Sequence, residues 1–270
     1  LTKCIDELKL FDEKLKVLRF VGMGEPLLHK KISEMVAYAV KSDVADRVEL
    51  LTNGSFLTNE MSDKLIESGL SRLVISLQGI SKEKYKEVSK VDLDFAKYVD
   101  NIKYFFKQKK NTHVYIKIVD YALTGEDTKS KYYEIFGDIC DSIAVENVVP
   151  IMPGVDYDQI FDEEEGEETQ FGIPLSNIDV CPQSFFTMQV NPDGKIVPCY
   201  QISYPGIMGD INEETMLEIW NGDRYNEFRR SMLDGRDQAN QVCKECNFIQ
   251  YRLFPEDDLR DSVGRLKKVY

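Results

Sequence analysis

Short apolar runs alternate with amphipathic helical segments along the first part of this 270-residue chain. In the segments between the runs, apolar residues recur every three or four positions, which is the spacing of one helical face. The predicted strands cover residues 17–21, 48–51, 73–77, 113–119 and 143–149. Strands separated by helices form parallel units with right-handed crossovers. The pattern therefore predicts an α/β fold, either an open doubly wound sheet or a partial barrel.

Glycine, proline and polar residues follow several of these predicted strands. They occupy residues 22–26, 52–54 and 76–79, together with Pro150. In barrels and open α/β sheets, ligands bind at the edge formed by the carboxyl ends of the strands. We therefore expect one shared ligand site at this edge.

The last third of the chain contains four of the six cysteines, at Cys181, Cys199, Cys243 and Cys246. The last two form a CxxC pair, which can turn two thiolates onto one metal centre. The first two flank a predicted hairpin with strands at 185–190 and 195–197. This spacing predicts a centre with four cysteine ligands, and both zinc and an iron–sulfur cluster accept such a set. Cys4 and Cys140 lie on apolar helical faces, so we expect them in the core.

Between the hairpin and the CxxC pair, Met216, Leu217 and Trp220 share one predicted helical face. Asn212 is a suitable residue to cap this helix at its amino end. We therefore expect a small α+β module, held in part by its metal centre.

The net charge of −13 argues against non-specific binding to nucleic acid or to anionic membranes, although a local basic pocket remains open. No apolar run approaches the roughly 20 residues of a transmembrane helix, and we expect no membrane partner. The chain shows no secretory signal peptide, and its cysteine content is too low for a disulfide scaffold. We therefore expect a cytoplasmic protein.

The segment Phe20-Val-Gly-Met-Gly-Glu-Pro26 resembles the GGEP motif of radical S-adenosylmethionine (SAM) enzymes. Residues 52–54 and 75–79 are also similar to strand-end motifs of that family. The cysteine-rich region resembles its auxiliary-cluster module, called SPASM or, in the shorter form, twitch. In this module a cysteine is followed by a GxxxxC motif, and here twelve residues separate Cys181 from Gly194.

The resemblance extends over about residues 15–250 and implies a partial (β/α)6 barrel followed by a small α+β auxiliary-cluster domain. The expected domains are a radical SAM barrel at 1–155, an acidic linker at 156–178, the SPASM/twitch domain at 179–255 and a C-terminal tail at 256–270.

The resemblance also implies which residues hold the cofactors. The expected SAM-binding residues are Gly22, Gly24, Glu25, Pro26, Asn53, Ser76 and Gln78. In the family the GGEP segment cradles the methionine amino group, and the third of the predicted strands would reach the ribose or the carboxylate with Ser76 and Gln78. The four clustered cysteines would bind an auxiliary 4Fe-4S cluster.

Two features depart from the family pattern. The CxxxCxxC motif that binds the SAM-cleaving cluster is absent from the printed residues. We expect it, together with a first strand, just upstream of Leu1, and a second 4Fe-4S cluster only if it is present. A full SPASM module carries more cysteines than this chain has. Four ligands fit one fully ligated cluster, for which electron transfer is the expected role.

The implied activity is reductive cleavage of SAM to a 5′-deoxyadenosyl radical, which abstracts hydrogen from a sugar-type or peptide substrate. Flavodoxin or ferredoxin is the expected electron donor. No catalytic acid or base is assigned, but Lys117 alternates with Ile116 and Ile118 and is expected to point into the barrel. The alternatives are a zinc-stabilised Cys4 α/β binding or scaffold module without redox activity, and a homologue that binds SAM without cleaving it.

Overall fold

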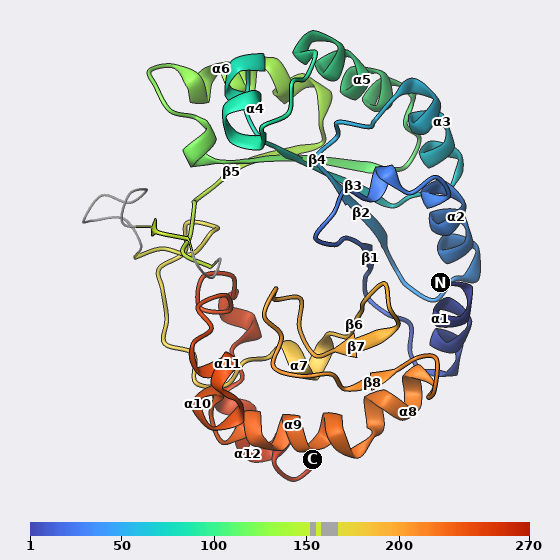
Figure 1. The fold of residues 1–270 in the computed structure, drawn as a ribbon, viewed down its shortest axis with the longest axis vertical. Helices are drawn as coiled ribbons and strands as arrows, with labels where there is room; N and C mark the ends of the chain where they lie inside the picture. Colours follow the sequence, from blue (N-terminus) through green and yellow to red (C-terminus); the bar gives the residue numbers. More distant parts are fainter. Residues whose placement is uncertain (152–154, 158–166) are drawn as a thin grey trace. The chain divides into compact units, whose positions relative to one another are not determined.

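The computed structural model describes residues 1–151, 155–157 and 167–270. These residues form two compact units, Leu1–Glu146 and Asn147–Tyr270, which are described separately below (Figure 1). None of the described helices is long and apolar enough to span a bilayer.

The first unit contains a five-stranded parallel sheet whose strands follow one another in chain order. Its strands are β1 (Leu18–Phe20), β2 (Val48–Thr52), β3 (Arg72–Leu77), β4 (His113–Val119) and β5 (Ser142–Glu146). The five predicted strands are thus confirmed, with one difference at the end of the last. Strand β5 stops at Glu146 because the backbone N–H of Asn147 donates to the carbonyl of Gln170 instead of continuing the ladder, at 3.0 Å.

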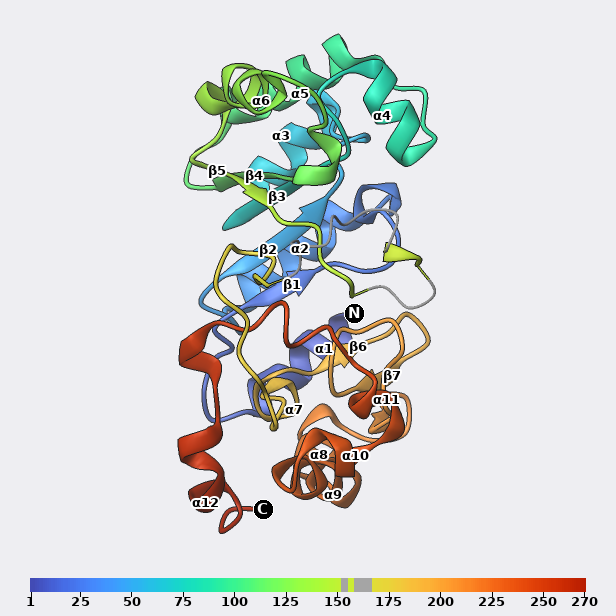
Figure 2. The ribbon, with the colours of Figure 1, turned by 90° about the vertical axis from the view of Figure 1, so that its left-hand side faces the viewer.

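Helices precede and connect these strands. They are α1 (Thr2–Glu7), α2 (Ile32–Ser42), α3 (Asn59–Glu67), α4 (Lys82–Ser89), α5 (Phe95–Gln108) and α6 (Thr128–Phe136), with 3₁₀ segments η1 (Leu8–Leu10), η2 (Pro26–Leu28), η3 (Asp120–Ala122) and η4 (Gly137–Ile139). Figures 1 and 2 show α2, α3, α5 and α6 on one face of the sheet. A doubly wound sheet carries helices on both faces, so this unit is an open, partial barrel.

The two faces of the sheet differ in composition. Side chains such as Leu50, Leu73 and Ile116 point toward the helices and are fully buried. The alternate residues of each strand form the opposite face, which we call the inner face. The inner face carries charged and polar residues, among them Glu49 and Lys117. Ligands can therefore be held on this face without disrupting the core.

The helix ends follow capping rules. Thr58 precedes α3, and its hydroxyl accepts a hydrogen bond from the Met61 N–H at 3.2 Å. Gly69 follows the same helix with φ +77°, the left-handed conformation that favours glycine at a helix C-terminus. Threonine and glycine are favoured residue types at these two positions, and the two caps fix where the chain re-enters the sheet as β3.

The second unit is built around a small antiparallel sheet in the order β6-β7-β8. Its elements are α7 (Gln183–Phe186), β6 (Gln189–Val190), β7 (Lys195–Val197), β8 (Gly209–Asp210), α8 (Met216–Asn221), α9 (Asp223–Leu233), α10 (Arg236–Ala239), α11 (Gln241–Lys244), η6 (Pro255–Asp257), η7 (Arg260–Ser262) and α12 (Val263–Leu266). Buried Arg229 of α9 lies over the ring of Trp220 at 4.0 Å and that of Tyr225 at 4.2 Å, which fixes α8 against α9.

Two local predictions in this unit were wrong. Residues 185–190 do not form a continuous strand, because the chain turns through α7 before β6 begins; the Thr187 N–H closes this turn on the carbonyl of Gln183 at 2.8 Å. Asn212 does not cap α8. Thr215 does so, in a capping box with Glu218, while the Asn212 amide donates to Asp210.

The structure tests the predicted tail, but it covers only part of the predicted linker. Residues 158–166 of the predicted acidic linker lie outside the described residues. The predicted tail contributes to the second unit, since Val263, Leu266 and Tyr270 pack on a buried cluster that contains Met232 and Leu233. Because α12 is only one turn long, its few apolar residues do not form a helical pattern that can be recognised in the sequence.

Candidate cofactor sites

Glu25 joins two of the strand-end motifs at the carboxyl edge of the sheet. Its Oε1 accepts from the Thr52 hydroxyl at 2.6 Å and from the Leu27 N–H at 2.9 Å, and its Oε2 accepts from the Asn53 N–H at 2.8 Å. The carboxylate has room for about four hydrogen bonds, of which these contacts use three. Glu25 therefore acts first as a clamp between the loop after β1 and the end of β2.

Asn53 is held from three sides. Its Oδ1 accepts from the N–H and the hydroxyl of Ser55 at 2.9 and 2.6 Å. Its backbone carbonyl accepts from the Tyr98 hydroxyl at 2.8 Å and the Tyr85 hydroxyl at 3.2 Å. Burial, with the nearby Tyr85, raises the pKa of Tyr98 well above 10.0, so this hydroxyl stays protonated and donates. Within the described part of the chain these contacts leave the amide nitrogen of Asn53 able to meet a ligand.

Gly22 and Gly24 lie in the exposed loop that precedes this clamp. A Cβ atom added to either glycine would meet no other atom within 4 Å, and neither has a positive φ. Packing within the described chain and backbone conformation thus do not explain the glycines. Open space beside the backbone is what a ligand such as SAM needs for close approach to carbonyl and N–H groups, and this region fits the cofactor.

Ser76 and Lys117 are neighbours in register on β3 and β4, so both side chains lie on the inner face. The prediction that Lys117 points inward is confirmed. Its ammonium lies 2.7 Å from the Glu146 carboxylate on β5. Among the described residues, the hydrogen bond of the Gln78 amide, just after β3, is a long one of 3.4 Å to the Ser76 carbonyl, so the amide is able to turn to a ligand.

Sequence reasoning missed two residues of this edge. Thr52 was taken only as part of a motif, yet its hydroxyl bridges Glu25 and the Gly54 N–H. Tyr98 lies on the apolar face of α5, and nothing in the sequence distinguishes its hydroxyl from the other groups of that face. The bridging role of Thr52 could have been predicted from two features of the sequence. Its strand ends in Thr-Asn-Gly, and a glutamate follows the preceding strand.

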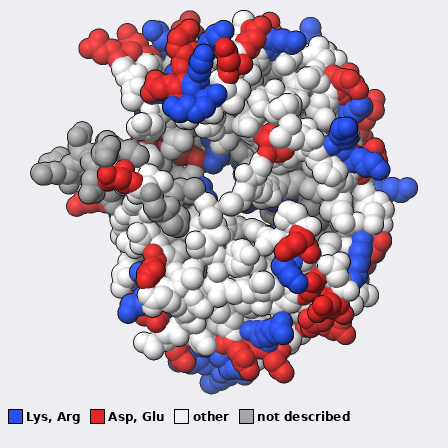
Figure 3. Space-filling model, viewed as in Figure 1, with Lys and Arg blue, Asp and Glu red and all other residues white. Residues whose placement is uncertain are grey.

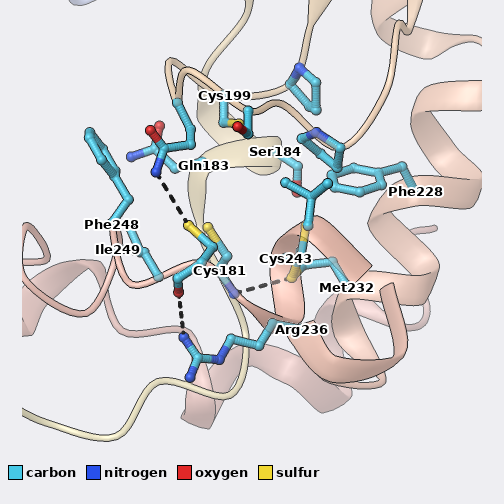
Figure 4. Close-up of a pocket in the computed structure, with 16 residues that line it drawn as sticks. Cys181, Gln183, Ser184, Cys199, Phe228, Met232, Arg236, Cys243, Phe248 and Ile249 are labelled. Carbon is cyan, nitrogen blue, oxygen red and sulfur yellow. Dashed lines mark hydrogen bonds between the residues drawn. The ribbon is translucent and has the colours of Figure 1, made fainter. Parts of the chain in front are cut away.

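The four cysteines of the second unit line one cavity of about 40 Å³ (Figure 4). Cys181 precedes α7, Cys199 follows β7, and the CxxC pair lies in and just after α11. Among the described residues, no three His, Cys, Asp or Glu side chains converge as ligands of a single ion. A zinc ion gathers its sulfurs at about 2.3 Å, whereas a 4Fe-4S cluster takes one thiolate at each iron. The four thiols that line this cavity can supply one thiolate to each iron, so the donor set fits a 4Fe-4S cluster.

Without a metal, the folded environment favours the protonated, neutral form of three of these thiols. Burial raises the pKa of Cys199 from 9.0 to about 11 and that of Cys243 to about 12, and it raises that of Cys181 further. The backbone N–H groups of Gln183 and Gln201 lower the pKa of Cys181 and Cys199, respectively, because they stabilise the thiolate. They therefore offset part of the effect of burial. Binding of a cluster would therefore displace protons, and these N–H groups would stabilise the thiolates that ligate it.

Polar groups around Cys246 complete the cavity. The Arg236 guanidinium donates to the Cys246 carbonyl at 3.0 Å, and the Gln201 amide lies 3.9 Å from its sulfur. Phe248 and Ile249 supply apolar walls. A cationic group beside an apolar cavity suits an iron–sulfur centre, whose thiolates carry negative charge.

Comparisons with known proteins agree with this geometry. Residues 2–130 match the family model described as the radical SAM superfamily, and residues 181–247 match SPASM, described as an iron-sulfur cluster-binding domain. The chain is 24% identical over 251 residues to the S-adenosyl-L-methionine-dependent 2-deoxy-scyllo-inosamine dehydrogenase of Niallia circulans, covering 89% of this chain and 79% of that protein. It is 30% identical over 237 residues to a GTP 3',8-cyclase of Helicobacter pylori, covering 76% of this chain and 72% of that protein.

Solved structures share the fold. BtrN in complex with AdoMet and 2-DOIA superposes with a TM-score of 0.56 at 18% identity, over 93% of this chain and 80% of that one. Native anSMEcpe with bound AdoMet gives a TM-score of 0.59 at 14% identity, over 93% of this chain and 77% of that one.

Two family models in the expected order, a relative at 30% identity and a shared partial barrel all lead to one assignment. SAM and iron–sulfur clusters are the cofactors of this family, and the residues described above fit them. The chain belongs to the radical SAM superfamily and carries a SPASM iron–sulfur cluster-binding domain.

Proposed function

We propose that this protein is a radical SAM enzyme of the twitch type that oxidises or modifies a sugar-type or peptide substrate by hydrogen abstraction. The observation that carries the proposal is the set of four thiols around one cavity in the unit that follows the barrel. When bound, SAM and the iron–sulfur centres supply a 5′-deoxyadenosyl radical and a path for electrons.

In the first unit, the residues that would hold SAM lie along the carboxyl edge of the sheet. The backbone around Gly22, Gly24 and Pro26 would meet the methionine ammonium, with the Glu25 carboxylate held close by Thr52 and Asn53. Ser76 and Gln78 would donate to the ribose or to the carboxylate. Because the Glu25 clamp fixes two loops before SAM arrives, the site is preorganised for the ligand.

In the second unit, Cys181, Cys199, Cys243 and Cys246 would ligate the auxiliary 4Fe-4S cluster. Four protein thiolates leave no iron open to substrate, so the cluster site serves electron transfer. Arg236 places a positive charge beside Cys246, which favours the reduced, more negative state of the site. A site of this kind suits an electron acceptor for a substrate radical.

Relatives bind two classes of substrate. BtrN was solved with 2-DOIA and anSMEcpe with a peptide. We propose the small-molecule or peptide class for this chain as well, with flavodoxin or ferredoxin as the electron donor.

The test is anaerobic reduction of the cluster-loaded polypeptide, including any natural sequence that precedes Leu1, in the presence of SAM. We expect 5′-deoxyadenosine and methionine to form in equal amounts. The matched control is Asn53→Ala, which removes a proposed SAM contact and is expected to lower SAM affinity. Protein that holds its clusters and binds SAM but forms no 5′-deoxyadenosine would contradict the proposed activity.

A further inference from the structure

The inner face of the sheet contains a cavity of about 130 Å³, and none of the residues that line it is a proposed ligand of SAM or of the auxiliary cluster. Four strands of the first unit line it. The charged and aromatic residues among its walls are Arg19, Glu49, Arg72, Tyr115 and Lys117. The function proposed above gives this cavity no task.

The register of the sheet explains why these side chains meet. Arg19 on β1 is aligned with Glu49 on β2, and Glu49 is aligned with Arg72 on β3. Aligned residues of parallel strands point to the same face, so the three form one row across the inner face.

Positive charge exceeds negative charge in this row. Three guanidiniums share the single buried carboxylate of Glu49: two nitrogens of Arg19 lie 2.7 and 2.8 Å from Oε2, the Arg47 Nε lies 2.6 Å from Oε1, and the Arg72 Nη1 stays at 3.6 Å. Lys117, at the far end of the cavity, is balanced by Glu146. The cavity is therefore locally basic.

This local charge stands out in a chain with a net charge of −13. On the face shown in Figure 3, Lys and Arg side chains are interspersed with Asp and Glu. The two arginines of the row, with Arg47 beside them, surround one glutamate and concentrate positive potential at the cavity, which attracts anions from solution.

Arg72 points most clearly to a ligand. Its Nε–H is buried and has no hydrogen-bond acceptor in the described part of the chain, and its closest contact with Glu49 is too long for a hydrogen bond. Its guanidinium lies over the Tyr115 ring, 4.8 Å from the ring centre, which holds the plane in place. A fixed guanidinium with an unmet donor matches the paired oxygens of a carboxylate or phosphate.

We infer that this cavity binds an anionic group, a phosphate or a carboxylate, on the substrate. The inference rests on the proposed function for the identity of its ligand as a substrate, and it narrows that substrate to a molecule with an acidic group. Arg72 and Arg19 would donate to the anion, and Glu49 would hold both guanidiniums in position.

Isothermal titration of the cluster-loaded protein, without reductant, tests this with inorganic pyrophosphate and with succinate as probes. We expect saturable binding of one or both, weakened at least about tenfold by Arg72→Gln. Glu49→Gln keeps an amide oxygen that can hold the guanidiniums but removes the negative charge that competes with the anion, so it should tighten binding. Arg224→Gln, which changes an exposed arginine on α9, is the matched control and should change nothing. The preferred probe identifies the anionic group.

A purely structural role for the row predicts a different result. Arg72→Gln and Glu49→Gln would then both lower the melting temperature and leave probe affinity unchanged, or no probe would bind to the wild type at millimolar concentrations; either result overturns the inference. If Arg72→Gln does not fold, Arg72→Lys keeps the charge but loses the paired donors and is expected to weaken binding. Probe binding needs no SAM cleavage, so failure here and failure of the proposed activity are separate results.

Discussion

At the scale of single residues, Glu25 holds together the carboxyl edge of the sheet, where we propose that SAM binds. Its carboxylate accepts from Thr52, Asn53 and Leu27, and the same three donors orient the two loops that would surround the methionine end of SAM. Hydrogen bonds to a charged acceptor contribute about 1.5–3 kcal/mol each. A change at this one residue therefore affects both stability and ligand binding.

We expect Glu25→Gln to lower SAM affinity by about tenfold or more and to lower the free energy of unfolding by about 1–3 kcal/mol. The glutamine NH₂ group is a donor, so it would face an N–H or hydroxyl donor that now has a carboxylate oxygen as its acceptor. Equilibrium dialysis with SAM and urea unfolding measure the two effects. Glu34→Gln, on the exposed side of α2, is the control. Equal SAM affinity in wild type and Glu25→Gln would show that the clamp does not prepare the site.

The partly buried thiols of the cysteine cavity make the metal-free protein sensitive to alkaline pH. The folded-state pKa of Cys199 is raised from 9.0 to about 11, so folding favours the protonated thiol. Its contribution to stability is fully present below pH 9 and is lost as pH rises through about 11, because the unfolded chain deprotonates first.

Between pH 8 and pH 10.5 we therefore expect the metal-free wild type to lose about 1–2 kcal/mol more unfolding free energy than Cys199→Ala. Urea unfolding at the two pH values under reducing conditions measures the difference. Cluster-loaded protein should lack this component, since its thiolates are already deprotonated. Parallel pH dependence of wild type and variant would argue against a buried neutral thiol at this position.

At the scale of elements, the turn after β2 shows how local geometry shapes the site. Gly54 has φ +76°, and a Cβ there would lie 3.1 Å from the Tyr98 ring and 3.2 Å from Ile75. This glycine is required by backbone conformation and by packing together, whereas its neighbour Asn53 carries the polar contacts. The three consecutive residues of the Thr-Asn-Gly sequence thus supply a hydrogen-bond bridge, the proposed SAM contact and the turn.

Gly54→Ala is expected to cost about 1–3 kcal/mol of unfolding free energy and to weaken SAM binding, because the displaced turn moves Asn53. Gly137→Ala is the matched control, with φ −59° and no atom within 4 Å of the added methyl group; it should be neutral or slightly stabilising. Denaturant unfolding and SAM dialysis compare the two. Similar losses in both variants would mean that the turn has no special constraint.

Helices and strands could be predicted from the sequence where one interaction, such as burial of an apolar run, determined the local structure. The five strands are short runs of apolar residues between helices, and burial against those helices selected them. The strand expected at 185–190 was wrong at its start because Pro182 begins a helical turn that competes with the extended form. Asn212 failed as a cap because Thr215, with Glu218 three residues later, offered reciprocal hydrogen bonds.

At the scale of the whole molecule, two compact units carry two kinds of site. The barrel provides the carboxyl edge and the basic inner cavity, and the second unit provides the cysteine cavity. Sequence spacing identified the cysteines and the strand-end motifs. It could not reveal the arginine row, because Arg19, Glu49 and Arg72 are far apart in sequence and meet only through strand register.

The most direct measurement of the central claim is an anaerobic determination of iron, sulfide and zinc, with a visible spectrum, on a chain of these 270 residues. One auxiliary cluster predicts a brown protein with about four irons and four sulfides per chain. Cys243→Ser should lose most of this metal, whereas Cys140→Ser, outside the cavity, should retain it. A colourless protein with one tightly bound zinc and no sulfide would contradict the account, and the second unit would then be a zinc-stabilised module without an electron-transfer role.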